Sequence, residues 1–245
     1  MTKAEIQFVR SLADKRYRDQ EQCFIAEGDK LIGEILDSTL KIKHLYAIEG
    51  HFTDKAEIVT AKEMERISQL KTASTSLAVV ERPRHHAPKT APANALTLAL
   101  DGVQNPGNLG TIIRLADWFG ISDIYCSMDT ADCYNPKVIQ ATMGAILRVR
   151  IHYLSLPEFL AATAASQIPV YGTMLDGKNI YNAELTPSGV IVMGNEGKGV
   201  SDECVRSFSH RLLIPSYPAS RQGSESLNVA MATGIVCAEF RRRCQ

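Results

Sequence analysis

Short apolar runs alternate with amphipathic segments from residue 95 to the end of the sequence. In the amphipathic segments the apolar positions recur at helical spacing, whereas the runs are mostly apolar. The pattern predicts strands over 96–101, 121–127, 149–155, 169–174, 189–194 and 210–215, and helices over 111–120, 136–148, 157–167, 201–209 and 225–243. Apolar strands separated by amphipathic helices indicate a parallel sheet with helices on both faces.

The first part of the chain has a more mixed pattern. Helical spacing covers 4–12, 29–36 and 61–70, and short strands are predicted at 23–28, 44–48, 56–60 and 76–82. These segments predict a small α/β domain.

A proline-rich stretch separates the two patterns. Residues 82–94 read RPRHHAPKTAPAN, with few apolar side chains and no periodicity. Proline disfavours both helix and hydrogen-bonded strand, so the stretch is typical of an interdomain linker. We therefore predict domains at 1–82 and 95–245 and a linker at 83–94. A long surface loop within a single domain is the alternative.

Composition narrows the class of protein. The 245 residues carry 27 Lys and Arg against 27 Asp and Glu, so the net charge gives no indication of a nucleic-acid partner. A local basic patch is compatible with this neutral total. No apolar run approaches the roughly 18 residues of a membrane-spanning helix, and the charged start does not resemble a signal peptide. The scattered cysteines lack metal-site spacing and predict reduced thiols. We expect a cytoplasmic protein with no metal and no membrane contact.

Two glycine-rich loops follow predicted strands, at the sheet edge where parallel α/β folds bind ligands. Gly102, Gly107 and Gly110 lack the GxGxxG spacing of dinucleotide sites. In the second loop Lys198 is followed by Gly199 and not by the hydroxyl residue of a phosphate-binding Walker loop. Both a generic nucleotide-binding enzyme and an NTPase are therefore disfavoured.

A third polar loop precedes the last predicted helix. We expect Ser224 or Glu225 to begin this helix, so that Ser226 and Asn228 lie in its first turn. Unpaired backbone amides at a helix start can face a ligand. An ordinary helix cap is the alternative.

Three segments taken together resemble the ordered motifs of one family. DGVQNPGNLGTIIRLADWFG at 101–120, VIVMGNEGKGVS at 190–201 and IPSYPASRQGSESLNVAMATG at 214–234 are similar to the motifs of the SpoU (TrmH-like) RNA ribose 2′-O-methyltransferases of the SPOUT class. FIAEGDKLIGEIL at 24–36, with KRYR before it, resembles the substrate-binding domain that precedes many such catalytic domains. The resemblance implies an α/β SPOUT domain with a C-terminal trefoil knot that binds S-adenosylmethionine, behind a small α/β RNA-binding domain.

The resemblance also implies which residues serve the site. Family members hold the cofactor mainly through backbone groups of the knot loops, and the matching positions are Thr173, Gly194, Asn195, Gly197, Ile214 and Leu227. The matching catalytic positions are Arg114, Asn108, Glu196, Ser226 and Asn228.

The implied reaction methylates a ribose 2′-hydroxyl, a poor nucleophile until its proton is lost or shared. Arginine is an awkward base, because its pKa exceeds about 12. Our hypothesis is that Arg114 holds the hydroxyl and an adjacent phosphate, while Glu196 orients Arg114 or its loop. From the residues alone, an ion pair between Arg114 and Asp117 is the simpler interpretation.

RNA affinity in a neutral chain must come from a local surface. The predicted phosphate contacts are Lys15, Arg16 and Arg18, with Arg148 and Arg150 as weaker candidates. A solvated charged face is the alternative for each group.

The resemblance further implies a homodimer formed through the knotted domain, for which Trp118 and Phe119 are interface candidates unless they are simple core residues. An rRNA substrate is favoured by family analogy. A tRNA methyltransferase and a non-catalytic RNA-binding or ribosome-assembly protein stay open as alternatives.

Overall fold

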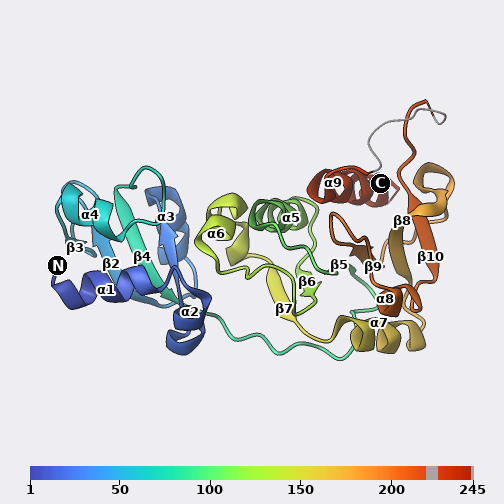
Figure 1. Ribbon diagram of the computed structural model, residues 1–245, viewed down its shortest axis with the longest axis horizontal. Helices are drawn as coiled ribbons and strands as arrows, with labels where there is room; N and C mark the ends of the chain where they lie inside the picture. Colours follow the sequence, from blue (N-terminus) through green and yellow to red (C-terminus); the bar gives the residue numbers. More distant parts are fainter. Residues whose placement is uncertain (219–225, 244–245) are drawn as a thin grey trace. The chain divides into compact units, whose positions relative to one another are not determined.

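The computed structural model describes residues 1–218 and 226–243, and the chain divides into two compact units (Figure 1). The first unit comprises Met1–Arg84 and Asp132–Leu147, and the second comprises His85–Ala131 and Arg148–Gln245. Residues 132–147 thus pack with the first unit, although their sequence position suggested the second domain. Ile139 explains this packing, because it joins a core cluster with Phe24 and Ile35 of the first unit.

The first unit is built on a mixed four-stranded sheet in the order β1-β4-β2-β3. Strands β1 and β2 run antiparallel to β4, and β3 runs parallel to β2. One face packs against α1 and α4, and the other packs against α3 and α6. The elements are α1 (Lys3–Ser11), α2 (Lys15–Glu21), β1 (Cys23–Glu27), α3 (Asp29–Leu36), β2 (Ile42–Ala47), β3 (Glu57–Ile58), α4 (Ala61–Ile67), β4 (Ser76–Glu81), α6 (Pro136–Thr142) and η1 (Ala145–Leu147).

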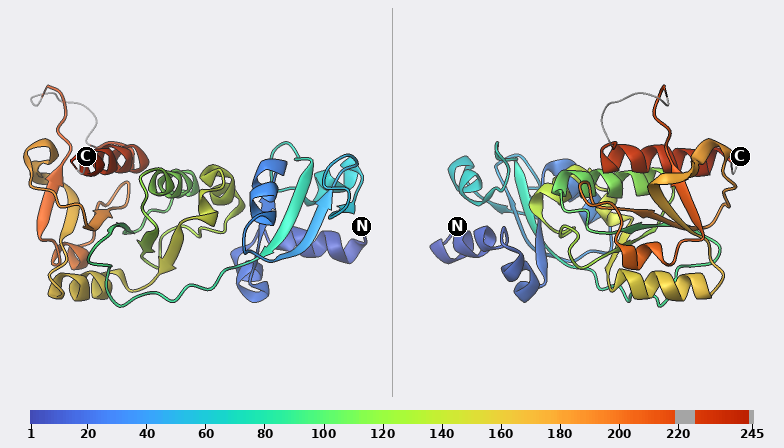
Figure 2. Two further views of the ribbon diagram at one scale, coloured as in Figure 1. Left: turned by 180° about the vertical axis from the view of Figure 1, so that it is seen from behind. Right: turned by 45° about the vertical axis from the view of Figure 1, so that its right-hand side comes forward.

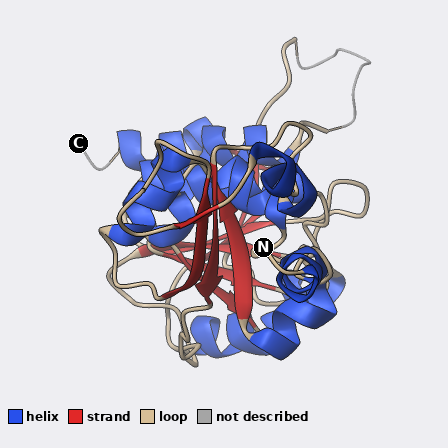
Figure 3. Ribbon diagram, turned by 90° about the vertical axis from the view of Figure 1, so that its left-hand side faces the viewer, coloured by secondary structure: helices blue, strands red, loops and turns tan. Residues whose placement is uncertain are grey.

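The second unit is built on a six-stranded sheet in the order β10-β8-β9-β5-β6-β7, with every neighbouring pair parallel. Helices α5 and α9 pack together on one face, and α7 and α8 lie on the other (Figure 2). The elements are β5 (Leu96–Leu100), α5 (Pro106–Trp118), β6 (Asp123–Cys126), β7 (Arg150–Tyr153), α7 (Leu156–Ala165), β8 (Val170–Asn179), η2 (Ile180–Asn182), β9 (Gly189–Met193), α8 (Asp202–Val205), β10 (His210–Leu213) and α9 (Val229–Arg242). The predicted parallel sheet with helices on both faces is confirmed. Figure 3 draws the helices of both units in blue and their strands in red.

The central strands of this sheet end level with one another. In the register, Leu100 at the end of β5 lies beside Cys126 of β6 on one side and Met193 of β9 on the other. Strands β5, β6 and β9 are buried along their whole length, which explains why most of their residues are apolar. The loops that follow β5 and β9, which carry the first and second motifs, therefore leave the sheet at one edge.

Both helices next to the motifs begin at an asparagine cap. Helix α5 begins at Pro106, before the predicted 111, because Asn105 Oδ1 accepts hydrogen bonds from two amides of the first turn and proline suits the first helical position. Helix α9 begins at Val229 with Asn228 as its cap, so Ser226 and Asn228 precede the first turn and the prediction that they lie within it is wrong. The predicted start at Ser224 or Glu225 lies outside the described residues.

In the described part of the chain, no helix has both the length and the apolarity to cross a membrane. No group of three His, Cys, Asp or Glu side chains there is placed to hold a metal ion. The trefoil knot stays a prediction, because strand order and register describe neighbours and not the threading of the chain.

Candidate active site

A cavity of about 1180 Å³ lies in the second unit beside the middle of β8 and the carboxyl ends of β9 and β10. The loops after β9 and β10 and the start of α9 complete its walls. All six residues predicted to bind the cofactor line it, namely Thr173, Gly194, Asn195, Gly197, Ile214 and Leu227. Glu196 and Ser226 of the predicted catalytic set line it too. The cavity therefore brings together residues from the second and third motifs.

The loop after β9 has a fixed backbone. Asn195 and Gly199 form an antiparallel bridge, with two backbone hydrogen bonds of 2.9 Å. The Asn195 side-chain oxygen also accepts the amide hydrogens of Gly197 and Lys198, at 2.9 and 3.0 Å. A Cβ on Gly194 would overlap the backbone of Gly199, so this close approach requires glycine. The loop thus presents main-chain groups to the cavity in one defined arrangement.

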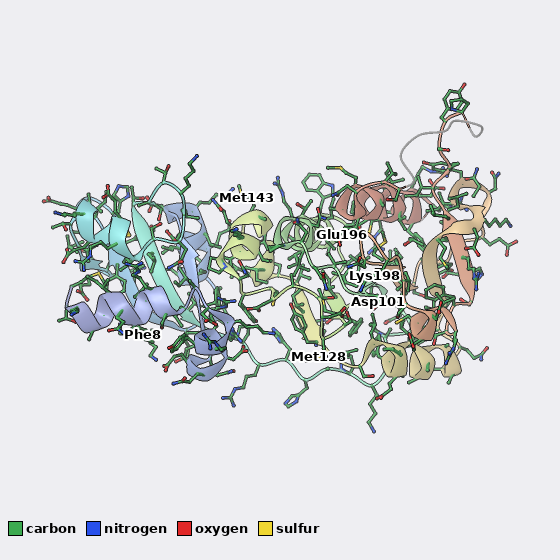
Figure 4. The ribbon with its side chains drawn as sticks, in the orientation of Figure 1. Phe8, Asp101, Met128, Met143, Glu196 and Lys198 are labelled. Carbon is green, nitrogen blue, oxygen red and sulfur yellow. The ribbon has the colours of Figure 1, made fainter. Side chains whose placement is uncertain are left out.

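Asp101, at the end of β5, anchors the second-motif loop. Its Oδ2 accepts hydrogen bonds from the amide and the hydroxyl of Ser201, at 2.7 and 2.6 Å. Asn195 Nδ2 donates to the carbonyl of Gly102 at 2.6 Å. Figure 4 labels Asp101 together with Glu196 and Lys198 of the loop that it anchors. Sequence reasoning assigned no role to Asp101, although its position at a strand's carboxyl end was an available signal.

A chain of side-chain hydrogen bonds joins all three motifs. Asn228 Nδ2 donates to Asn108 Oδ1 at 3.0 Å, and Asn108 Nδ2 donates to Glu196 Oε1 at 2.7 Å. Asn228 Oδ1 simultaneously caps α9 by accepting the amide hydrogen of Ala230 at 3.0 Å. Three of the five predicted catalytic residues are therefore held in direct contact, and they link α5 to the cavity wall and to the start of α9.

Arg114 lies exposed on α5 and makes no hydrogen bond or ion pair with any described residue. Asp117, the partner expected from the residues alone, instead accepts hydrogen bonds from Arg148 Nε at 3.0 Å. The interpretation of Arg114 as half of a helix ion pair is therefore wrong. All five of its N–H donors remain available to a ligand.

The three predicted phosphate contacts on α2 have different surroundings. Lys15 is exposed, and Arg16 is exposed but paired with Asp14 at 2.7 Å. Arg18 is only 1% exposed; its Nη2 pairs with Asp132 at 2.7 Å, and its Nη1 donates to two backbone carbonyls beyond α1. The prediction that Arg18 contacts a phosphate is wrong, because the side chain is buried and its nitrogens already have partners.

The two weaker phosphate candidates are ion-paired within the second unit. Arg148 pairs with Asp117, and Arg150 donates from Nε to Asp123 at 2.8 Å. Burial acts to raise the pKa of Asp123, but hydrogen bonds from Arg150 and His152 outweigh it and leave that pKa below its usual value. Neither arginine has the open guanidinium of Arg114.

Comparison with protein families decides the chain's classification. Residues 95–238, more than half of the sequence, match the SpoU rRNA Methylase family. The chain belongs to the SpoU rRNA methylase family. Its three motifs lie within the matched SpoU range. Residues 3–85 match the MRM3-like substrate binding domain, which confirms the resemblance read from the N-terminal segment.

Individual SpoU relatives resemble the chain over nearly its whole length. The 23S rRNA (guanosine(2553)-2′-O)-methyltransferase RlmP of Bacillus subtilis is 29% identical over 95% of this chain and 94% of its own. A TrmH-family protein from Porphyromonas gingivalis has 40% identity and a TM-score of 0.89, with 99% of both chains covered. An AdoMet-bound rRNA methyltransferase from Sinorhizobium meliloti has 29% identity and a TM-score of 0.86, covering 100% of this chain and 97% of that one.

Proposed function

We propose that this SpoU chain transfers a methyl group from S-adenosylmethionine to a ribose 2′-hydroxyl of rRNA. The observation that carries the proposal is the hydrogen-bonded chain of Asn228, Asn108 and Glu196, which joins three motifs beside the cavity. Relatives support the substrate class, since RlmP is a 23S rRNA 2′-O-methyltransferase. The Sinorhizobium meliloti relative supports the cofactor, since its structure is AdoMet-bound.

The residues at the cavity fit S-adenosylmethionine. Gly194 and Gly197 leave main-chain groups accessible, and Ile214 and Leu227 supply apolar surface for an adenine ring. Ligand sites of this kind combine apolar walls with a few placed polar groups. When bound, the cofactor supplies an electrophilic methyl group on a sulfonium.

Arg114 is the proposed activator of the ribose hydroxyl. Its planar guanidinium can donate to the 2′-oxygen and to an adjacent phosphate at once, which lowers the cost of negative charge on that oxygen as its proton passes to solvent water. A guanidinium is a permanent cation in proteins, so this side chain stabilises the charge and does not accept the proton. Asn108 and Glu196 fix the geometry of the loops on either side, and Ser226 shapes the cavity wall.

RNA capture is proposed for α2 of the first unit. Lys15 and Arg16 are exposed there, and Tyr17, which follows them, is 45% exposed. A basic side chain can hold a phosphate while an exposed ring stacks on a base.

The partner of the second unit is proposed to be a second copy of the chain. Trp118 at the end of α5 is 83% exposed, which is unusual for so large an apolar side chain and supports an interface there. Phe119 beside it is only partly exposed. Sedimentation equilibrium should show a dimer for the wild type and a monomer for Trp118→Glu. A cytoplasmic location stays a prediction from the cysteine pattern.

Tritium transfer tests the reaction and the substrate together. The purified protein is incubated with tritiated S-adenosylmethionine and unmethylated transcripts of Bacillus subtilis 23S rRNA or tRNA, and the modified nucleotide is then mapped. We expect alkali-stable label in the rRNA. Label confined to tRNA would contradict the rRNA proposal and favour a tRNA methyltransferase. Calorimetric binding of S-adenosylmethionine with label in neither RNA would favour the non-catalytic alternative.

A further inference from the structure

Lys198 and Tyr217 line the cavity and have no role in the chemistry just described. We propose that they hold the RNA strand at the cavity, Lys198 through a phosphate and Tyr217 by stacking on a nucleobase. The inference rests on the proposed function and adds to it two residues that position the substrate.

Lys198 is the unpartnered cation of the cavity wall. The charged residues among the described lining are Asp176, Glu196 and Lys198. Asp176 pairs with Arg211 at 2.8 Å, and Glu196 accepts from Asn108, whereas the Lys198 ammonium has no partner in the described part of the chain. An open ammonium group suits a phosphate oxygen.

The backbone under Lys198 is ordered even though its side chain is exposed. Its amide donates to Asn195 Oδ1 at 3.0 Å, within the turn that the Asn195–Gly199 bridge closes. The ammonium group is therefore carried on a fixed base beside the cofactor-binding loop. A cation fixed in this way can bind the phosphate at one position of the RNA strand. It therefore positions the RNA and does not only add to its general electrostatic attraction.

Tyr217 presents an aromatic ring almost entirely to solvent. It is 91% exposed, the highest value among the large apolar side chains of the described residues, and it lines the same cavity. Leu175 and Leu227, which are 71% and 54% exposed, add apolar surface to the lining. RNA recognition commonly stacks an unpaired base on such a ring, and stacking tolerates any base because each has a π face.

The volume of the cavity allows for both ligands. Sites for single small molecules occupy about 300–1,000 Å³. The cavity here measures about 1180 Å³, so a cofactor leaves room for part of a nucleotide. The wall that carries Lys198 and Tyr217 is therefore free to face RNA.

Separate binding measurements test the inference. The probe is a short unmethylated transcript of Bacillus subtilis 23S rRNA that spans nucleotide 2553, the site named for the relative. Filter binding at several salt concentrations gives the RNA Kd, and calorimetry gives the S-adenosylmethionine Kd. The variants are Tyr217→Ala, Tyr217→Phe and Lys198→Gln. The matched controls are Tyr181→Ala and Lys178→Gln, which remove an exposed tyrosine and an exposed lysine outside the cavity lining.

Tyr217→Ala should raise the RNA Kd and the KM for RNA about tenfold, the scale of one lost base stack, while Tyr217→Phe keeps the ring and the affinity. Lys198→Gln should weaken RNA binding and reduce the salt slope by about one. Neither change should alter the S-adenosylmethionine Kd.

RNA Kd values within twofold of the control variants would overturn the inference. So would a parallel loss of S-adenosylmethionine affinity, which would assign Tyr217 to the cofactor. If the wild type binds RNA but transfers no methyl group, the proposed function fails, while the RNA Kd values still decide whether these two residues hold the strand.

Discussion

Helix α2 of the first unit and helix α5 of the second each carry an arginine singled out as functional, and the two have opposite surroundings. Arg18 on α2 is buried, with Asp132 and backbone carbonyls around its guanidinium. Arg114 on α5 is exposed and has no partner among the described residues. A buried guanidinium is tolerated only when paired, so Arg18 serves the fold, whereas Arg114 is free to meet a ligand. Availability of donors, and not charge, separates the two roles.

The basic triplet at the end of α9 extends this comparison. Arg243 donates from Nη2 to the carbonyls of Ile180 and Tyr181, and Arg241 donates to the carbonyl of Phe119 at 2.7 Å. Arg242 pairs with Glu239 at 2.8 Å. Three consecutive arginines in a sequence suggest a nucleic-acid contact, yet here Arg241 and Arg243 bind the carbonyls at the ends of other elements and Arg242 pairs within its own helix.

The largest effect is expected at Arg18. Arg18→Ala should lower the free energy of unfolding of the first unit by about 3–5 kcal/mol, because it removes the close partner of the largely buried Asp132 and leaves only Arg82, 4.0 Å away. Lys15→Gln, on the same helix, should change stability by less than about 0.5 kcal/mol and flatten the salt dependence of RNA binding. Urea unfolding and salt-dependent filter binding measure both. An Arg18 variant of normal stability with a flattened salt slope would reverse the assignment.

The next effect is expected at Arg114. Arg114→Lys keeps the charge but loses the planar fork, so kcat at saturating RNA should fall about 100-fold. The urea midpoint and the S-adenosylmethionine Kd should stay at their wild-type values, because the side chain has no partner in the described protein. Arg148→Lys on the same unit is the control. Full methyl transfer by Arg114→Lys would exclude a geometric role for the guanidinium.

A smaller effect is expected along the asparagine chain. Asn228→Asp keeps the acceptor that caps α9 but cannot donate to Asn108, so activity should fall about tenfold. The free energy of unfolding should fall by much less than the roughly 1 kcal/mol that a lost helix cap costs. Asn228→Ala should lose both the cap and the hydrogen bond to Asn108. A double-mutant cycle with Asn108→Ala should show coupling of at least about 0.5 kcal/mol in kcat/KM. Strictly additive effects would mean that the two residues act independently.

The smallest effect is expected at Glu239 and depends on pH. Hydrogen bonds from Arg242 and then Arg243 lower the pKa of Glu239 to about 2 from its usual 4.5. A lowered folded-state pKa stabilises the protein above the unfolded value, and that contribution is lost as the pH falls through about 2. The stability difference between wild type and Glu239→Gln, measured by urea unfolding, should therefore be constant above pH 5 and shrink toward pH 2. A difference independent of pH would exclude the ion pairs as its source.

Local patterns predicted most of the second unit because its strands are buried on both faces. Predominantly apolar runs such as 96–100 and 189–193 identify such strands without any knowledge of their neighbours. The cofactor positions were likewise predictable by resemblance, since the motifs keep the loop residues in order, and the cavity brings them together. Their roles there stay predictions.

Long-range pairing explains what sequence reasoning missed. The partner of Arg18 is Asp132, more than a hundred positions away, and no local pattern announces it. Asp101 holds Ser201 across a similar separation. By contrast, a local signal for the start of α5 at Pro106 was present and was missed, because Asn105 followed by Pro106 is a typical helix beginning.

The placement of residues 132–147 has a consequence for how the protein can be divided. The chain passes from one unit to the other after residues 84, 131 and 147, so three covalent connections join the two units. Proteolysis within 85–94 would therefore leave residues 132–147 covalently attached to the second unit, with residues 1–84 held to them by packing alone. An isolated fragment of residues 1–84 would lack Ile139 and expose the apolar surface around Phe24 that it covers. Exchanging N-terminal domains between SpoU relatives would require residues 132–147 to move with them.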